Sequence, residues 1–411
     1  MKKHDKNKVA TEFIWNMIGV CINSFISLFY LIIVTRINGI SNAGIFSYYY
    51  SISLVLYSFI NYGGRNYQTS DFDKEFKDIQ YFNIRYITSF ITLLFLFVIL
   101  IFSNNINKIL ILSMFVLARI IESFSDSLYA VFQKKNHLDY VGKSLILKNI
   151  LSLLLFVIID IYFKNMYLAV ASILLSTVFV YLVYDKVKQR QLLKTKEKFN
   201  ISISKSILWA TKYYCLFNLI VMLLANIPRF FVEYNFTSVE QGYFGIIIMI
   251  PSVMVLLGQV ILQPVIIKLT DYYGKREFTH FTSLSRKLFL CIFLITISCC
   301  TFVYYFGSTI LQFLYNMNFA DYNIIFVLII IAGMFNVFAN YFSTFLTIMR
   351  YTKKQFYIYI IILLISCILL YIGSKFNFKA MFIVYLLSMI VQAFVFFVYY
   401  KFEFNKEKKN G

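Results

Sequence analysis

The stretch R-I-I-E-S-F-S-D (119–126) places three charged side chains in a long apolar part of the chain. It directly follows the apolar segment I-L-I-L-S-M-F-V-L-A (109–118). At 100° per residue, Arg119, Glu122 and Asp126 share one side of a helix with Ser123, and the opposite side is apolar. A guanidinium can bind phosphate, and a carboxylate can bind a proton or a cation. The spacing therefore predicts a polar helix face that does not contact lipid.

Two interpretations fit this face. A charge at the centre of a bilayer costs about 2.5–3.5 kcal/mol on insertion scales, so each charge needs water, a counter-charge or a ligand. The face could line a water-filled cavity. Alternatively, Arg119 and Glu122, which are three residues apart, could pair with each other and hold helices together. We favour the cavity, with Arg119 as a substrate-binding residue.

Other predicted helices carry polar residues on one side. Lys148 is followed by Asn149 and Ser152, and Lys212 lies near an inner helix end from which its ammonium could also snorkel to water. The neutral polar faces could instead be packing seams of small residues. If these polar sides line a cavity, the further substrate-binding candidates are Lys148, Lys212, Asn23, Asn218, Asn336 and Asn340.

The elements that position these residues must be membrane-spanning helices. Of the 411 residues, 60% are hydrophobic and 14% are charged, and the mean hydropathy is +0.73, which no soluble domain shows. A spanning helix needs roughly 20 mostly apolar residues. The sequence predicts an all-α membrane protein with about twelve spans: 12–34, 44–63, 83–103, 109–133, 144–162, 167–185, 207–228, 243–267, 285–306, 322–343, 356–374 and 379–401.

The net charge of +20 indicates membrane topology rather than nucleic-acid binding. With the N-terminus inside, the inner segments hold 30 of the 39 Lys and Arg residues, and the outer loops hold 6. Cytoplasmic loops collect these residues. We therefore expect both termini to be cytoplasmic.

The longest connection divides the chain into two groups of six spans. The predicted domains are an N-terminal lobe (1–185), a basic cytoplasmic linker (186–206), a C-terminal lobe (207–401) and a cytoplasmic tail (402–411). A weak repeat relates the lobes: S-N-A-G-I-F (41–46) resembles V-E-Q-G-Y-F (239–244), and Asn61 matches Gln259 at the same offset. Binding sites in such folds lie near the midplane between the halves. Pro251 should loosen its helix, and Pro228 and Pro264 are expected at helix ends.

No motif indicates catalysis or a cofactor. The six cysteines lie in predicted spans without a CxxC pair, and the three histidines are far apart in sequence, so we expect no metal site. The chain has no HExxH, GxxxxGK[ST] or GxSxG motif. We expect a protein that is not an enzyme.

Four segments carry a resemblance to a known family. They are T-E-F-I-W-N (11–16), R-I-N-G-I-S-N-A-G-I-F-S (36–47), G-G-R-N-Y-Q-T-S-D (63–71) and Y-F-N-I-R (81–85). This part of the chain resembles the Wzx-type oligosaccharide flippases of the MOP superfamily, which also contains the MATE drug exporters and the lipid II flippases. The twelve-span layout extends the likeness over the whole chain.

The resemblance implies a function in the bacterial plasma (inner) membrane. Such proteins move undecaprenyl-diphosphate-linked oligosaccharide repeat units from the cytoplasmic to the outer leaflet by alternating access of two lobes. Their products are O-antigen, capsule or exopolysaccharide. Partners could include a polysaccharide polymerase and a chain-length regulator. A cationic central cavity is typical of the family, and Arg119, Lys148 and Lys212 are the candidates here. Glu122 and Asp126 are candidates for coupling to H⁺ or Na⁺.

Two alternative functions can be distinguished from a flippase by features of the sequence. A MATE-like exporter of small cations would need a net acidic cavity, whereas the charged cavity candidates are three bases, Arg119, Lys148 and Lys212, and two acids, Glu122 and Asp126. A polysaccharide polymerase or ligase would need a catalytic outer loop, whereas the outer connections are short and poor in catalytic side chains. The sequence does not identify the sugar or the coupling ion.

Overall fold

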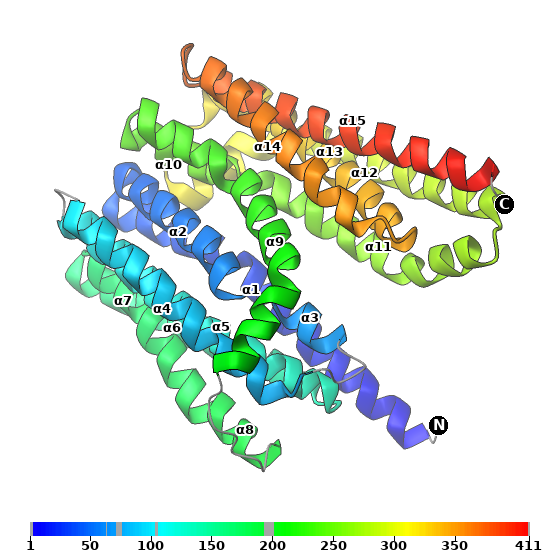
Figure 1. The fold of residues 1–411 in the computed structure, drawn as a ribbon. Helices are drawn as coiled ribbons and strands as arrows, with labels where there is room; N and C mark the ends of the chain where they lie inside the picture. The colour runs from blue at the N-terminus through cyan, green and yellow to red at the C-terminus, as the bar shows by residue number, and fades with distance from the viewer. Residues whose placement is uncertain (1–2, 63, 71–75, 103–105, 193–200, 410–411) are drawn as a thin grey trace. The chain divides into compact units, whose positions relative to one another are not determined.

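The chain folds into long helices in a computed structural model that describes residues 3–62, 64–70, 76–102, 106–192 and 201–409 (Figure 1). Within those ranges there is no β-strand. The chain divides into two compact units, residues 1–222 and 223–411, with the division inside one long helix. The predicted linker (186–206) is helical up to Leu192 and again from Ile201, and its residues 193–200 lie outside the described ranges. The lobe boundaries of the sequence analysis stay a prediction.

Unit 1 contains the helices that carry most of the predicted site residues. Its elements are α1 (Lys3–Asn38), α2 (Ile40–Ile60), α3 (Gly64–Ser70), α4 (Asp78–Phe102), α5 (Ile106–Lys134), α6 (Leu138–Phe163), α7 (Met166–Val180), the π-helix η1 (Tyr181–Asp185), α8 (Lys186–Leu192) and the first part of α9 (Ile201–Asn235).

Unit 2 contains the rest of α9 and a second set of helices. They are α10 (Ser238–Ile247), α11 (Ile250–Gly274), α12 (Phe278–Tyr315), the 3₁₀ helix η2 (Ala320–Tyr322), α13 (Asn323–Ile348), α14 (Thr352–Gly373) and α15 (Ala380–Lys409).

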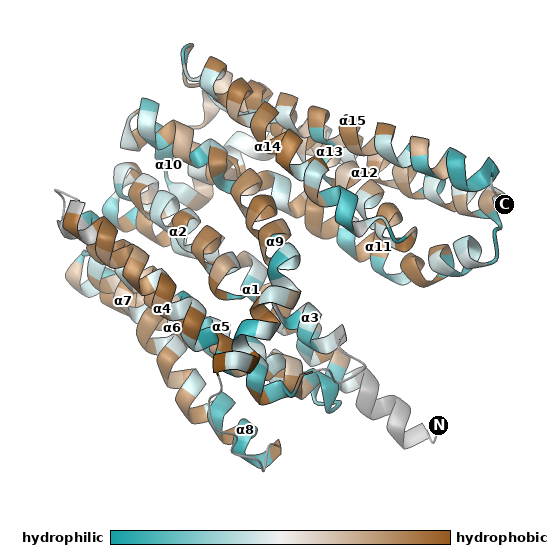
Figure 2. Cartoon of the chain, in the orientation of Figure 1, coloured by the Kyte–Doolittle hydropathy of each residue, from teal (hydrophilic) through white to brown (hydrophobic). Residues whose placement is uncertain are grey.

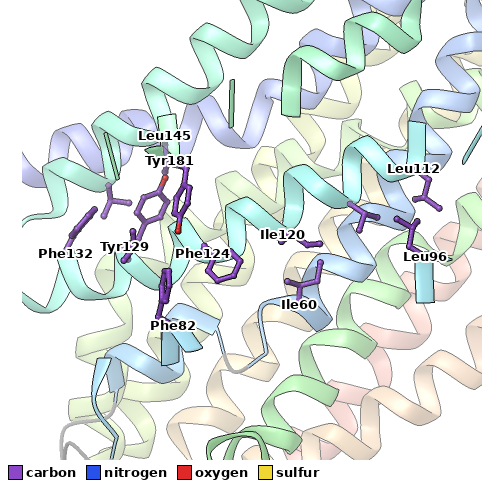
Figure 3. Close-up of a cluster of buried hydrophobic side chains, with 13 residues drawn as sticks. Ile60, Phe82, Leu96, Leu112, Ile120, Phe124, Tyr129, Phe132, Leu145 and Tyr181 are labelled. Atoms are coloured by element: carbon purple, nitrogen blue, oxygen red, sulfur yellow. The ribbon is translucent and has the colours of Figure 1, made fainter. Parts of the chain in front are cut away.

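Helix α5 is the central helix of unit 1, in contact with α2, α3, α4, α6 and α7. Every fourth residue of α5 from Leu112 to Phe132 belongs to one buried hydrophobic cluster. Figure 3 shows Phe124 of this row beside Phe82 of α4. Side chains four residues apart lie on one helix side, so this row turns the charged residues 119, 122 and 126 away from the cluster.

Helix α1 packs along α6 through a glycine contact and three polar pairs. A Cβ atom added to Gly19 would lie 2.6 Å from the carbonyl oxygen of Gly142, so the two backbones touch. Further along, Asn23 accepts a hydrogen bond from Asn149 at 3.1 Å, the Tyr30 and Ser152 hydroxyls are 2.5 Å apart, and Asn38 donates to both Asp160 oxygens at 2.7 Å. Buried polar groups of both helices are thereby satisfied.

The helix contacts of unit 1 recur in unit 2. The pairs α2 with α5, α4 with α5, α5 with α7 and α6 with α7 have the counterparts α11 with α13, α12 with α13, α13 with α15 and α14 with α15. The corresponding helices also follow one another in the same order along the chain in both units. It provides a structural basis for the weak internal repeat of the sequence.

Eleven helical segments among the described residues are long and apolar enough to cross a membrane. Eleven predicted spans correspond to them, with α10 and α11 together forming one. The twelfth is α5, which is 29 residues long but carries Arg119, Glu122 and Asp126 in its middle. Figure 2 shows apolar residues along the helices and hydrophilic residues at the C-terminal end of α15. The predicted all-α membrane fold is confirmed.

Two of the three predictions about proline were wrong. Pro251 stands in the first turn of α11, directly after the break that separates α11 from α10, so it does interrupt its span. Pro228 and Pro264, however, lie inside α9 and α11 and not at helix ends. A membrane helix can tolerate an internal proline because neighbouring groups and local helix adjustments satisfy the freed backbone carbonyls.

Candidate functional site: a charged cavity in unit 1

A cavity of about 440 Å³ lies within unit 1, and its wall comes from helices far apart in sequence. Helices α1, α2, α3, α5, α6 and α7 all contribute side chains. Of the predicted site residues, Asn23, Arg119, Glu122, Asp126 and Lys148 lie in the wall. The charged face of α5 therefore borders a cavity, as the first interpretation of the sequence required.

The cavity wall holds a three-membered ion cluster centred on Glu122. Arg119 pairs with Oε2 of Glu122 from the same helix. Lys148 of α6 pairs with Oε1 of Glu122 at 2.7 Å. The exposed fraction of all three side chains is between 10% and 14%. The Arg119–Glu122 pair therefore exists and also borders the cavity. One carboxylate is shared by two cations, so the cluster carries a net positive charge.

Two tyrosines of α2 hold the Arg119 guanidinium from the other side. Its central carbon lies 4.9 Å from the ring centroid of Tyr50 and 5.8 Å from that of Tyr57. An aromatic face attracts a cation within about 6 Å of the ring centroid. Arg119 is therefore fixed between a carboxylate and two rings, with its orientation set before any ligand arrives.

A second charged group lies where α2, α3 and α5 meet. Asp126 accepts a hydrogen bond from Asn61 at 2.9 Å, and Arg65 of α3 donates to Gln133 at 2.8 Å. Burial lowers the pKa of the Arg65 guanidinium from its ordinary value, and the negative charge of Asp126 opposes that shift. Arg65 lines the same cavity. Its wall therefore contains three cations, Arg65, Arg119 and Lys148, and two carboxylates.

A buried carboxylate lies directly behind the wall. Asp185 is 1% exposed and ends the π-helix η1. Ser125 of α5 and Ser144 of α6 donate to its two oxygens at 2.7 Å and 2.6 Å, and the Tyr129 hydroxyl lies 2.7 Å from that of Ser144. Ser125 and Tyr129 face the cavity on their other side. Asp185 joins this network from the π-helical turn, and such turns occur frequently at functional sites.

Four predicted site residues lie elsewhere. Lys212 of α9 is outside the cavity wall, and its Nζ lies 3.1 Å from the ring centroid of Trp209. Asn218, also on α9, is half-buried and outside the wall. Asn336 and Asn340 belong to α13 of unit 2, where Asn340 donates to Asn336 at 3.2 Å. The substrate-binding roles of these four residues stay predictions.

Three residues of the cavity wall, Arg65, Tyr50 and Tyr57, are not among the predicted site residues. Tyr50 and Tyr57 are seven residues apart and so lie on the same side of α2, a spacing that could have identified them. In the sequence, Arg65 follows the predicted span 44–63 and so belongs to an inner loop. The short helix α3 instead packs against α5 and brings Arg65 to the cavity.

The comparisons with known proteins agree with this architecture. No family profile matches the chain. The chain is similar to the capsular polysaccharide biosynthesis protein CapF of Staphylococcus aureus, with 26% identity over 348 residues, 83% of this chain and 85% of the relative.

Three solved structures have a similar fold. An inward-facing multidrug resistance MATE family transporter of the MOP superfamily gives a TM-score of 0.72 at 13% identity, over 96% of this chain and 99% of that one. An outward-facing MATE structure gives 0.59 at 17% identity, over 99% and 97%. A MOP superfamily transporter from Pyrococcus furiosus, described by the reverse polarity of its binding pocket, gives 0.59 at 15% identity, over 98% and 96%. The chain has the fold of these transporters and is a multi-pass membrane protein.

Proposed function

We propose that this protein is a flippase of the MOP superfamily. It would move an undecaprenyl-diphosphate-linked oligosaccharide from the cytoplasmic to the outer leaflet of a bacterial plasma membrane, for the synthesis of a surface polysaccharide. The excess of cations in the wall of the unit 1 cavity carries the proposal. The similarity to a capsular polysaccharide biosynthesis protein supports the class of substrate.

The chemistry of the cavity suits a diphosphate. A diphosphate carries negative charge that lipid tails cannot solvate, and a planar guanidinium can bind two of its oxygens at once. Arg119, Arg65 and Lys148 supply three cations at one wall. When no substrate is bound, Glu122 neutralises part of this positive charge and keeps Arg119 and Lys148 in place. We propose that the diphosphate binds these cations in competition with Glu122.

The neutral part of the wall suits a sugar. Asn23, Asn149 and Ser152 of α1 and α6 offer amide and hydroxyl groups, and Tyr50 and Tyr57 offer aromatic faces beside them. Amides and hydroxyls both donate and accept hydrogen bonds, as sugar hydroxyls do. The polyprenyl tail would stay in the bilayer while the polar head passes through the protein.

Reconstituted protein tests the proposal. Purified protein in liposomes should expose a fluorescent undecaprenyl-diphosphate oligosaccharide to an enzyme in the outer solution, at a rate above that of protein-free liposomes. Arg119→Ala should abolish this exposure. Lys275→Ala removes an exposed lysine directly after α11 that pairs with Asp271, and should not change it. Equal rates for Arg119→Ala and Lys275→Ala would contradict the proposal.

The competing function is a MATE-like export of small cations. The shared fold favours it, but the net positive wall opposes it, because a cationic drug would meet Arg65, Arg119 and Lys148. Accumulation of a cationic dye separates the two. Export of the dye by the protein, abolished by Glu122→Gln, would replace the flippase with an exporter.

A further inference from the structure

Three metal-binding side chains meet at one end of α1. Glu12 of α1, His137 in the turn between α5 and α6, and Asp139 in the first turn of α6 offer a carboxylate oxygen, a ring nitrogen and a carboxylate oxygen. These three atoms lie within 4.8 Å of one another. Glu12 is only 7% exposed. The group is separate from the charged cavity, and the proposed transport function does not use it.

The contact between α1 and α6 holds the three donors in place. Two turns along α1 from Glu12, Gly19 meets Gly142 of α6. A Cβ atom added to Gly142 would lie 2.1 Å from the carbonyl oxygen of Trp15, so no other residue type fits there without a shift. This backbone contact sets how closely α1 and α6 approach each other at this point. Glu12 is therefore kept opposite the turn that carries His137 and Asp139.

The neighbouring groups orient two of the three ligands. The ring of His137 stacks on that of Tyr140, with centroids 4.7 Å apart and planes 6° from parallel. Lys143 pairs with Oδ2 of Asp139 at 2.7 Å, and its ammonium lies 5.5 Å from the Trp15 ring centroid. A divalent cation would bind the carboxylates of Glu12 and Asp139 together with the ring of His137.

We propose that Glu12, His137 and Asp139 bind one divalent transition-metal ion, with Zn²⁺ as the best fit. Zn²⁺ accepts both imidazole nitrogen and carboxylate oxygen as ligands, and a water molecule completes its sites that have three protein ligands. Mg²⁺ and Ca²⁺ prefer oxygen ligands alone, so the histidine selects against them. The ion would connect the start of α1 to the turn before α6. The expectation of no metal site differs from this proposal because Glu12 is far from His137 and Asp139 in sequence, and only the contact between α1 and α6 brings them together.

Metal binding by the full chain tests this site directly. The protein should be purified with a tag that lacks histidine, stripped with a chelator and titrated with Zn²⁺ in detergent. We expect one ion per chain. Glu12→Gln and His137→Gln should each weaken binding roughly tenfold or more, because even loss of a residue that only supports a ligand costs 10–100-fold. The matched control is His280→Gln, which removes the exposed histidine of unit 2 and should leave the affinity unchanged.

Two further measurements separate this site from other binding. Co²⁺ bound to nitrogen and oxygen should lack the intense sulfur-to-metal charge-transfer band that binding to the six cysteines would give. Lys143→Gln removes the cation that competes for Asp139 and should tighten Zn²⁺ binding several-fold. Unchanged Zn²⁺ binding in both Glu12→Gln and His137→Gln, or a thiolate band with Co²⁺, would overturn the proposal. Unchanged affinity in Lys143→Gln would remove Asp139 from the set of ligands.

Discussion

Lys148 of α6 and Glu122 of α5 form an ion pair of 2.7 Å across two helices, and the second oxygen of the same carboxylate pairs with Arg119. The glutamate is thus held by one cation of its own helix and one of a neighbour. Loss of Arg119 leaves Glu122 paired with Lys148, whereas loss of Glu122 leaves two cations side by side. The cluster should respond differently to removal of each member.

Arg119 is the first member to test. Arg119→Ala should reach the membrane at wild-type level, because Lys148 still compensates Glu122, but transport should be lost. Arg119→Lys should restore only part of the rate, because the charge remains while the planar fork that binds two oxygens is lost. Complementation of a strain lacking its flippase, with protein amount measured in the membrane fraction, checks both.

A double variant of Arg119 and Glu122 tests the alternative hypothesis, in which this ion pair holds helices together and does not bind substrate. In that case Arg119→Ala with Glu122→Ala should transport better than Glu122→Ala alone, because it removes one of the two cations that loss of Glu122 leaves unpaired. We expect no such recovery, because the substrate would still lack its guanidinium. Wild-type transport by the double variant would remove Arg119 from the substrate site.

The acidic residues of the cavity differ in their partners. A coupling ion at Glu122 would have to displace Arg119 or Lys148, whereas Asp126 accepts only from the Asn61 amide among the hydrogen bonds described. Of the two candidates we therefore expect Asp126→Asn to lose its dependence on a proton or sodium gradient. Asp160→Asn is the matched control, because Asp160 is a buried aspartate of the same unit that is bonded to Asn38 outside the cavity. Gradient-driven transport in liposomes measures both, and full gradient dependence in Asp126→Asn would make this acid structural.

The glycine contact between α1 and α6 predicts a stability effect. In Gly142→Ala the new methyl group would meet backbone atoms of Trp15 and Asn16, which cannot rotate away. Overpacking of this kind costs roughly 1–3 kcal/mol. Gly274→Ala is the control, because a Cβ atom there has no neighbour within 4 Å. Thermal unfolding in detergent should show a clear loss of Tm for Gly142→Ala only, and equal Tm values would contradict the close approach.

The membrane topology is a separate prediction. We expect α8 and the C-terminal end of α15 to be cytoplasmic, because the inner segments hold 30 of the 39 basic residues. Alkaline phosphatase fused after Gln191 or Lys409 should be inactive, and a fluorescent protein at the same positions should fold. An active phosphatase at either position would mean that a span has been miscounted.

The sequence predicted the helices well, because most spans are long apolar runs, and every predicted span is helical, with one span divided between α10 and α11. It also predicted the polar side of α5, since periodicity along one helix is enough for that. The pairing of Glu122 with Lys148 could not be predicted, because it depends on how α5 and α6 are aligned with each other. The position of Arg65 was missed for a similar reason: helix α3 packs back against α5, and no periodicity within α3 shows this.

The ion pair between α5 and α6 also has a consequence for how the chain enters the membrane. Helix α5 is made before α6, and a single charge at mid-membrane costs about 2.5–3.5 kcal/mol on insertion scales. Alone, α5 can neutralise Glu122 with Arg119, but Lys148 becomes available only after synthesis of α6. Just three residues, 135–137, separate the two helices. The nascent chain would therefore leave the translocon with α5 and α6 as one helical hairpin, in which two helices of unequal hydrophobicity share the cost of the charges.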